Sequence, residues 1–186
     1  MKIKLNNKKY KIPTAEKLTV SQYIELSKLE KVSIVDYLKV VTGLEFADIS
    51  KIQIDEKTIY RINNFIGLII PFQYFYSLKS VPDDFYLNGK TFDLRKFDRL
   101  HFGLRVLFEQ RQQQTENPIE LAVYMFASFL SNGDGSGYDA DKANEIYLQL
   151  LEMNSFDIIS ISGFFLHKFM TGLWSGKSSL KRLLTK

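Results

Sequence analysis

The side chains best suited to catalysis or metal binding are two histidines and two pairs of aspartates. His101 and His167 lie far apart, each in an apolar stretch that predicts a helix, which is more typical of surface or half-buried histidines than of metal ligands. Paired carboxylates such as Asp83-Asp84, or Asp139 with Asp141, suit general acid–base catalysis. Both pairs stand where turns and helix caps favour aspartate in any protein. These residues therefore predict structural roles.

Two glycine-containing segments imitate ligand-binding loops. Residues 132–137 imitate the start of a calcium loop, but Ala143 stands where that loop requires a bidentate glutamate. Residues 172–178, Gly-Leu-Trp-Ser-Gly-Lys-Ser, are close to a P-loop, but the spacing between the glycines is one residue short and a helix precedes them instead of a strand. We predict no enzymatic activity, no bound metal and no cofactor.

Two predicted β-hairpins organise the chain. Asn88-Gly89 lies between the short runs 85–87 and 90–94, and Asn-Gly is a strong signal of a type I′ turn, which needs positive φ at both central residues. The segment 3–12 has a similar residue pattern, centred on Asn6-Asn7. One small sheet formed from both hairpins is a possible arrangement.

Helical patterns dominate the rest of the chain. Thr19 with Gln22 forms a capping box before a helix to about residue 30, and Ser33 begins a second helix that Gly43 stops. Further helices are expected at about 56–70, 96–111 and 118–130, then from Asp139 or Asp141, and at 156–171. A break is expected from Gly172.

The predicted fold class is therefore α+β and mainly helical, with six to seven helices and two short β-hairpins. A polar segment, 110–117, predicts a linker. Residues 1–114 are expected to form two hairpin-plus-helix units. Residues 115–186 are expected to form a helical C-terminal subdomain that shares or abuts the same core.

Charge and cysteine content limit the partners and the compartment. Residues 1–17 hold six lysines and one glutamate, residues 165–186 hold five basic residues and no acidic one, and the middle of the chain is acidic. The basic ends could contact nucleic acid, an anionic membrane or an acidic neighbour, or could be solvated chain ends. The chain has no cysteine, which fits a reducing compartment. The longest apolar run, 65–72, is too short to span a bilayer and no secretory signal is visible, so we expect no membrane association.

Several segments together point to one kind of protein. In the C-terminal half these segments are the apolar helix 121–130, the glycine-rich loop with Tyr138-Asp139, the Leu-Leu-Glu-Met-Asn helix end and the run 156–166. In the N-terminal part they are the segments 4–13 and 18–26. Together they resemble small virion or tail-assembly proteins of tailed bacteriophages, in particular those of crAss-like and other Bacteroides phages.

The resemblance implies a non-enzymatic structural component of a phage particle, in the head–tail connector, tail or baseplate region. Such a protein is made in the bacterial cytoplasm, ends in the virion, and binds other phage structural proteins, in multiple copies in a symmetric assembly. A transient tail-assembly chaperone is the first alternative. A nucleic-acid-binding protein that uses its basic ends is the second.

The expected interface combines aromatic and basic side chains. The aromatic run 72–76 is too dense for the inner face of one strand, so it is expected to meet a partner or to fill the space between the hairpin units. On the first hairpin, Lys8, Lys9 and Lys11 with Tyr10 could grip phosphates and stack a base, or could simply protect an edge strand. The candidate interface residues are Phe72, Tyr74, Phe75, Tyr76, Phe164, Phe165, Trp174, Lys177, Lys181 and Arg182.

Overall fold

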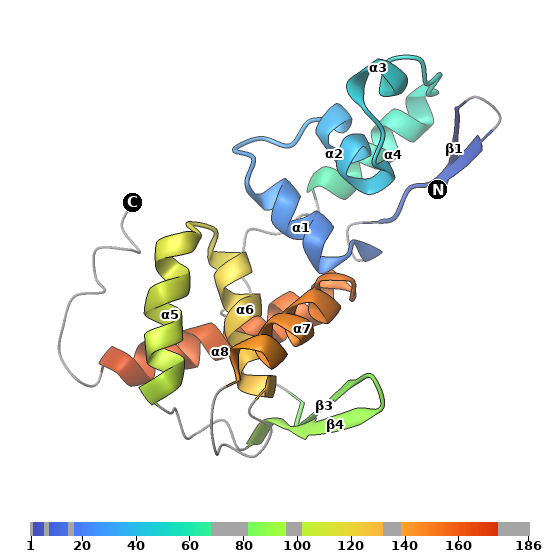
Figure 1. The fold of residues 1–186 in the computed structure, drawn as a ribbon. Coiled ribbons are helices and arrows are strands. Elements are labelled where there is room, and N and C mark those ends of the chain that lie inside the picture. The colour runs from blue at the N-terminus through green and yellow to red at the C-terminus, as the bar shows by residue number, and fades with distance from the viewer. Residues whose placement is uncertain are drawn as a thin grey trace.

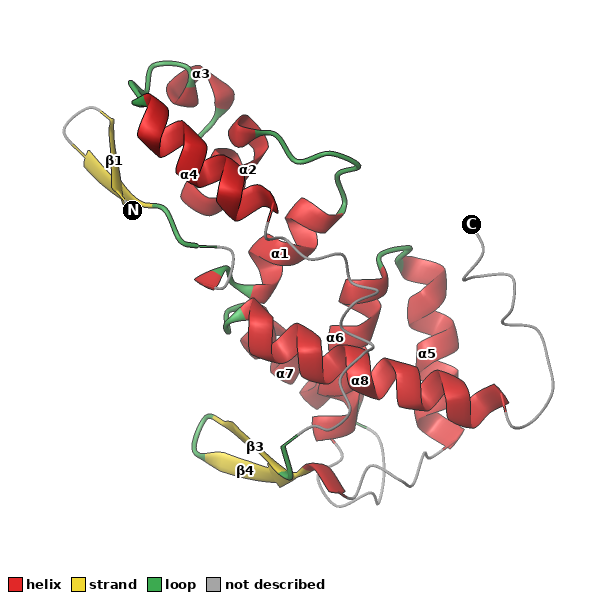
Figure 2. Ribbon diagram, turned by 180° about the vertical axis from the view of Figure 1, so that it is seen from behind, coloured by secondary structure: helices red, strands yellow, loops and turns green. Residues whose placement is uncertain are grey.

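The chain folds as a mainly helical α+β protein, which confirms the predicted class. The computed structural model describes residues 2–5, 8–14, 17–67, 82–95, 102–131 and 139–174. In Figures 1 and 2, α2 to α4 gather on one side of the molecule and α5 to α8 on the other, with α1 between them.

The four strands form two separate antiparallel ribbons. β1 (Lys2–Leu5) pairs only with β2 (Lys8–Lys11), and β3 (Asp84–Leu87) only with β4 (Lys90–Asp93), among the described residues. The possible single sheet is therefore wrong, because the two hairpins lie at different ends of the molecule (Figures 1 and 2). The turn prediction is confirmed: Asn88 and Gly89 have φ of 47° and 81°.

Two of the N-terminal helices begin at their predicted capping residues, Thr19 and Ser33, and the second also ends at the predicted Gly43. The N-terminal helices are α1 (Val20–Ser27), α2 (Ile34–Thr42), α3 (Phe46–Ile49) and α4 (Glu56–Gly67). The capping boxes at Thr19 and Ser33 both form, and Gly43 adopts φ of 69° at the end of α2. Only the short α3 was not predicted. It is a single turn, too short for helical periodicity to mark.

Two of the C-terminal helices, α5 and α8, continue past their predicted ends. The C-terminal helices are α5 (Phe102–Gln114), α6 (Pro118–Ser131), α7 (Ala140–Leu151) and α8 (Ser155–Trp174). The predicted linker is wrong for residues 110–114. Glutamine and arginine are good helix formers, and these residues form the C-terminal end of α5. The predicted break at Gly172 is also wrong. One glycine costs a helix only about 1 kcal/mol, and α8 continues to Trp174.

Helix α6 is the centre of the core. Its four predicted inward residues, Ile119, Val123, Phe126 and Leu130, are buried. The residues between them are mostly buried too, because α7 and α8 pack along α6 and the second hairpin lies against it. One connected cluster of buried side chains contains Ile3 of the first hairpin and Phe85 of the second. Residues from both predicted parts therefore share one core, while the boundary near residue 114 stays a prediction.

A short backbone bridge joins the beginning of α1 to the turn between α7 and α8. The amide of Ser155 donates to the carbonyl of Leu18 at 2.8 Å, and the amide of Val20 donates to the carbonyl of Met153 at 3.0 Å. Thr19 and Asn154 are opposite each other in this bridge. The bridge fixes the N-terminal helices to the C-terminal ones.

Candidate docking groove between the second hairpin and helix α7

An open groove of about 660 Å³ lies between the second hairpin and the C-terminal half of α7. We call it the hairpin groove. Figure 1 shows β3 and β4 near α7, whose C-terminal half forms the other wall. Its lining residues are Tyr86, Leu87, Asn88, Leu148, Gln149, Glu152 and Met153.

Strand alternation builds the hairpin wall. Phe85 and Leu87 are buried while Asp84 and Tyr86 are exposed, as expected where successive side chains point to opposite faces. The ring of Phe85 meets the ring of Phe126 on α6 edge-on, with centroids 5.1 Å apart. This contact anchors the hairpin and leaves the Tyr86 side chain 65% exposed.

Helical periodicity builds the other wall. Asp139 begins α7 by accepting a 3.0 Å hydrogen bond from the amide of Lys142. Ile146 and Leu150 then face the core. Leu148 lies on the outer side and is 62% exposed, so an apolar side chain interrupts an otherwise polar surface.

Acidic residues accompany the apolar ones along α7. Asp141, Glu145 and Glu152 are exposed, and Glu152 lines the groove itself. Asp84 shares the exposed side of β3 with Tyr86. The groove thus offers apolar contact area with an acidic rim, which suits a protein segment that carries apolar side chains and a lysine or arginine.

A half-buried charged cluster holds α1, α5, α6 and α7 together. Nη2 of Arg111 lies 3.2 Å from Oε1 of Glu120, and Nζ of Lys28 lies 3.5 Å from Oε2 of the same carboxylate. The Arg111 guanidinium carbon lies 4.6 Å from the ring centroid of Tyr124 and 5.6 Å from that of Tyr147. Burial, and then the charge of Glu120, raise the pKa of Tyr147. The charged groups pair with one another, while Nε of Arg111 is buried without a hydrogen-bond partner among the described residues. We assign the cluster a structural role.

Two of the ten candidate interface residues have described side chains. Phe165 is 1% exposed and its ring stacks on that of Phe126 with centroids 5.3 Å apart, so it is a core residue with no surface to offer a partner. Phe164 is half-buried beside it.

The side chains of the remaining eight candidates lie outside the described part of the structure. Trp174 is the last residue of α8. Phe72, Tyr74, Phe75, Tyr76, Lys177, Lys181 and Arg182 lie outside the described residues.

In the described part of the chain, the aspartates and histidines considered for catalysis or metal binding do not form one site. Asp139 caps α7, the carbonyl of Asp83 accepts a 2.7 Å bond from the amide of Leu94, and His167 is exposed on α8. His101 and the calcium-like segment 132–137 lie outside the described residues. Within the described ranges, no three histidine or acidic side chains are grouped as a metal site would require.

Tyr86 and Leu148 were not among the residues that the sequence patterns singled out. The signal for Tyr86 was present, because it alternates with the apolar Phe85 and Leu87 and so points outward. The signal for Leu148 was its place between the inward Ile146 and Leu150. Their meeting in one groove depends on how the hairpin packs on α6, which neither pattern contains.

In the described part of the chain, no helix combines the length and apolarity needed to cross a membrane. Comparisons of the chain with protein-family models, with curated proteins and with solved structures gave no significant match.

Proposed function

We propose that this protein acts by binding other proteins and that the hairpin groove is one of its docking sites. The observation that carries the proposal is the exposure of Tyr86 and Leu148, 65% and 62%, among the residues that line one groove. Large apolar side chains that are exposed together commonly mark protein interfaces.

The chemistry of the groove favours one kind of occupant. An apolar segment would cover Tyr86, Leu148 and Met153, and a lysine or arginine beside it would meet Glu152. The neighbouring Asp141 and Glu145 of α7 would speed the encounter with such a basic segment, because both are exposed.

The setting of this function is proposed from the sequence resemblance. On that basis the protein is a non-enzymatic component of a tailed-phage particle, in the connector, tail or baseplate region, that binds other phage structural proteins in a repeated assembly. A transient tail-assembly chaperone would use the same groove on an unassembled partner.

Site-specific cross-linking tests the groove. A photoreactive phenylalanine analogue is placed at Leu148 in the full chain, expressed in the cells that naturally produce it, and the cross-linked peptide is identified by mass spectrometry. The matched control carries the analogue at Phe46 on α3, which is 65% exposed and away from the groove. We expect one dominant protein partner from position 148, joined through an apolar segment with a basic residue, and little from position 46.

The outcomes separate the parts of the proposal. Equal cross-linking from both positions, or none from position 148, would overturn the docking site. A partner that is not a phage structural protein would overturn the setting alone. Mass spectrometry of purified particles then distinguishes the two roles, since a structural component is present in them and a chaperone is absent.

A further inference from the structure

The pairing register of the first hairpin places four lysines on one face. Lys2 is opposite Lys11 and Lys4 is opposite Lys9 in the β1–β2 ladder. Directly opposed residues of an antiparallel pair lie on the same face of the ribbon, and residues two apart on one strand share that face as well. We call positions 2, 4, 9 and 11 the lysine face.

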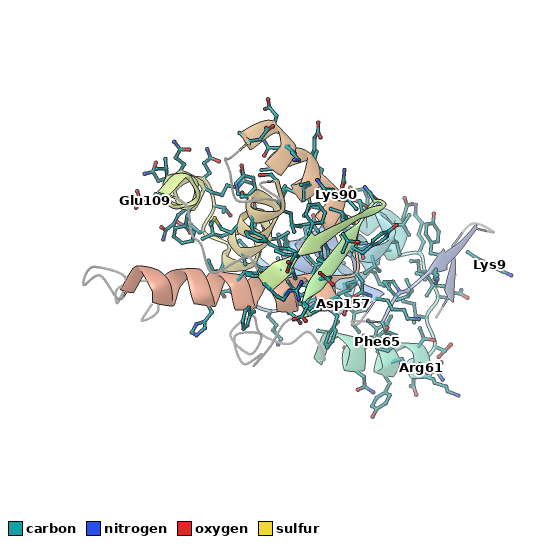
Figure 3. All side chains as sticks on the ribbon, turned by 90° about the horizontal axis from the view of Figure 1, so that it is seen from below. Lys9, Arg61, Phe65, Lys90, Glu109 and Asp157 are labelled. Carbon is teal, nitrogen blue, oxygen red and sulfur yellow. The ribbon has the colours of Figure 1, made fainter. Side chains whose placement is uncertain are left out.

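The other face of the hairpin packs on the protein. Ile3 is opposite Tyr10; Ile3 is buried and Tyr10 packs against the same core cluster. On the opposite face, the described side chains of Lys9 and Lys11 are both exposed. Figure 3 shows the Lys9 side chain pointing away from the helices. Tyr10 lies on the face opposite to Lys9 and Lys11, so the expected use of Tyr10 to stack a base beside these lysines is wrong.

The described lysines of this face, Lys9 and Lys11, lack acidic partners in the described part of the chain. Lysines that oppose each other across a ladder destabilise it. Several other exposed cations have acidic partners, as in the Lys39–Glu45 and Lys51–Asp48 pairs, at 3.6 and 3.4 Å. Neither Lys9 nor Lys11 has an ion-pair partner among the described residues. Lysines on an edge strand discourage pairing with another chain, but that role does not require them to face each other across the ladder. A bound polyanion would attract these lysines and so offset the repulsion between them.

We infer that the lysine face binds the phosphate backbone of double-stranded DNA. A two-stranded ribbon fits the major groove of B-form DNA, which is about 12 Å wide. Lysines two residues apart on a strand repeat about every 6.8 Å, twice the 3.4 Å rise per phosphate of each DNA strand. Ammonium groups contact phosphates as point charges, and phosphate contacts carry no sequence information directly, so binding through the backbone should be independent of DNA sequence.

The same arrangement disfavours the other polyanions. Single-stranded nucleic acid is usually held by aromatic stacking, and the described aromatic residue of this hairpin, Tyr10, packs on the core. The deep, narrow major groove of A-form RNA does not admit a ribbon. The inference does not depend on the hairpin groove, which lies on a different part of the molecule (Figures 1 and 2).

Fluorescence anisotropy with a labelled 20-base-pair duplex tests the inference on the full chain. The test variant replaces Lys2, Lys4, Lys9 and Lys11 with glutamine. The control variant makes the same change at four exposed lysines elsewhere, Lys31, Lys51, Lys57 and Lys90. The affinity for DNA falls as salt rises, and each phosphate contact contributes about 0.9 to the magnitude of the slope of log affinity against log salt. The test variant should therefore reduce the magnitude of this slope by about 3 to 4. The control variant should reduce it by less than about 1.

Three results would overturn the inference. They are an equal loss of slope in both variants, equal binding of the duplex and of a single strand of the same length, and competition by polyglutamate as strong as that by unlabelled DNA. The last result would favour an acidic protein partner. The protection of Lys9 and Lys11 against chemical acetylation by bound duplex, measured on the unmodified chain, gives a second readout if the test variant does not fold.

Discussion

Nδ2 of Asn117 donates a 2.9 Å hydrogen bond to Oγ of Ser27, a residue 90 positions earlier in the chain. Oδ1 of the same asparagine accepts from the amides of Ile119 and Glu120, both at 3.0 Å. One side chain therefore caps the first turn of α6 and ties it to the last residue of α1. The beginning of the central helix is fixed by a residue of the N-terminal half.

Replacing Asn117 with alanine should test this double role. The loss of the cap and of the bond to Ser27 should lower the free energy of unfolding by about 1 to 2 kcal/mol. Urea unfolding followed by circular dichroism measures the change. Asn144→Ala is the control, since Asn144 is exposed within α7 and alanine is the better helix former. Equal effects of the two substitutions would show that Asn117 has no special role.

The Arg111–Glu120 pair should be coupled more strongly than an exposed ion pair. Their side chains are 24% and 17% exposed, and Arg111 also lies over the ring of Tyr124. A double-mutant cycle with Arg111→Met and Glu120→Gln should give a coupling of about 1 to 2 kcal/mol in unfolding free energy. Arg111→Lys should recover only part of it, because lysine lacks the planar group that stacks on the ring.

The Lys39–Glu45 pair is the control for that cycle. Its side chains are 57% and 77% exposed. Solvent screening and side-chain entropy should keep its coupling below about 0.5 kcal/mol. Similar couplings for both pairs would argue against a structural role for the buried cluster.

The neighbours Phe164 and Phe165 should respond differently to truncation. Phe165→Ala removes a ring that stacks on Phe126 and Phe129, and should cost about 3 to 5 kcal/mol of unfolding free energy. Phe164→Ala should cost clearly less, because its side chain is only half-buried. Thermal or urea unfolding of both variants measures the difference. A milder effect at Phe165 would contradict its placement in the core.

Stability should fall at high pH because of Tyr37. Burial raises the pKa of Tyr37 from 10.0 to about 12, and its hydroxyl donates a 2.9 Å bond to the carbonyl of Pro13. Between about pH 10 and pH 12 the unfolded chain loses this proton while the folded chain keeps it, so stability decreases as pH rises. The contribution of Tyr37 to this loss is on the order of 2 kcal/mol.

Tyr37→Phe should flatten this pH dependence without abolishing it. Burial also raises the pKa of Tyr23 to about 12, so part of the slope remains. Unfolding free energies at pH 8, 10 and 11.5 measure the effect. Identical slopes for both chains would contradict the burial of the Tyr37 hydroxyl in the folded state.

The sequence by itself determined the local elements with short-range signals. The type I′ turn at Asn88-Gly89, the capping box at Thr19, the helix cap at Ser33 and the end of α2 at Gly43 each depend on residues that are neighbours in the chain. Such signals act within a few residues, which is why they can be read without a fold.

Only the tertiary structure decided how these elements come together. The burial of α6 on nearly all sides, the separation of the two hairpins, and the bond from Asn117 to Ser27 depend on residues far apart in the chain. A periodic pattern marks one buried face of a helix and cannot say that neighbours will cover the others. The hairpin groove arose in the same way, because the packing of Phe85 on Phe126 placed the second hairpin beside α7.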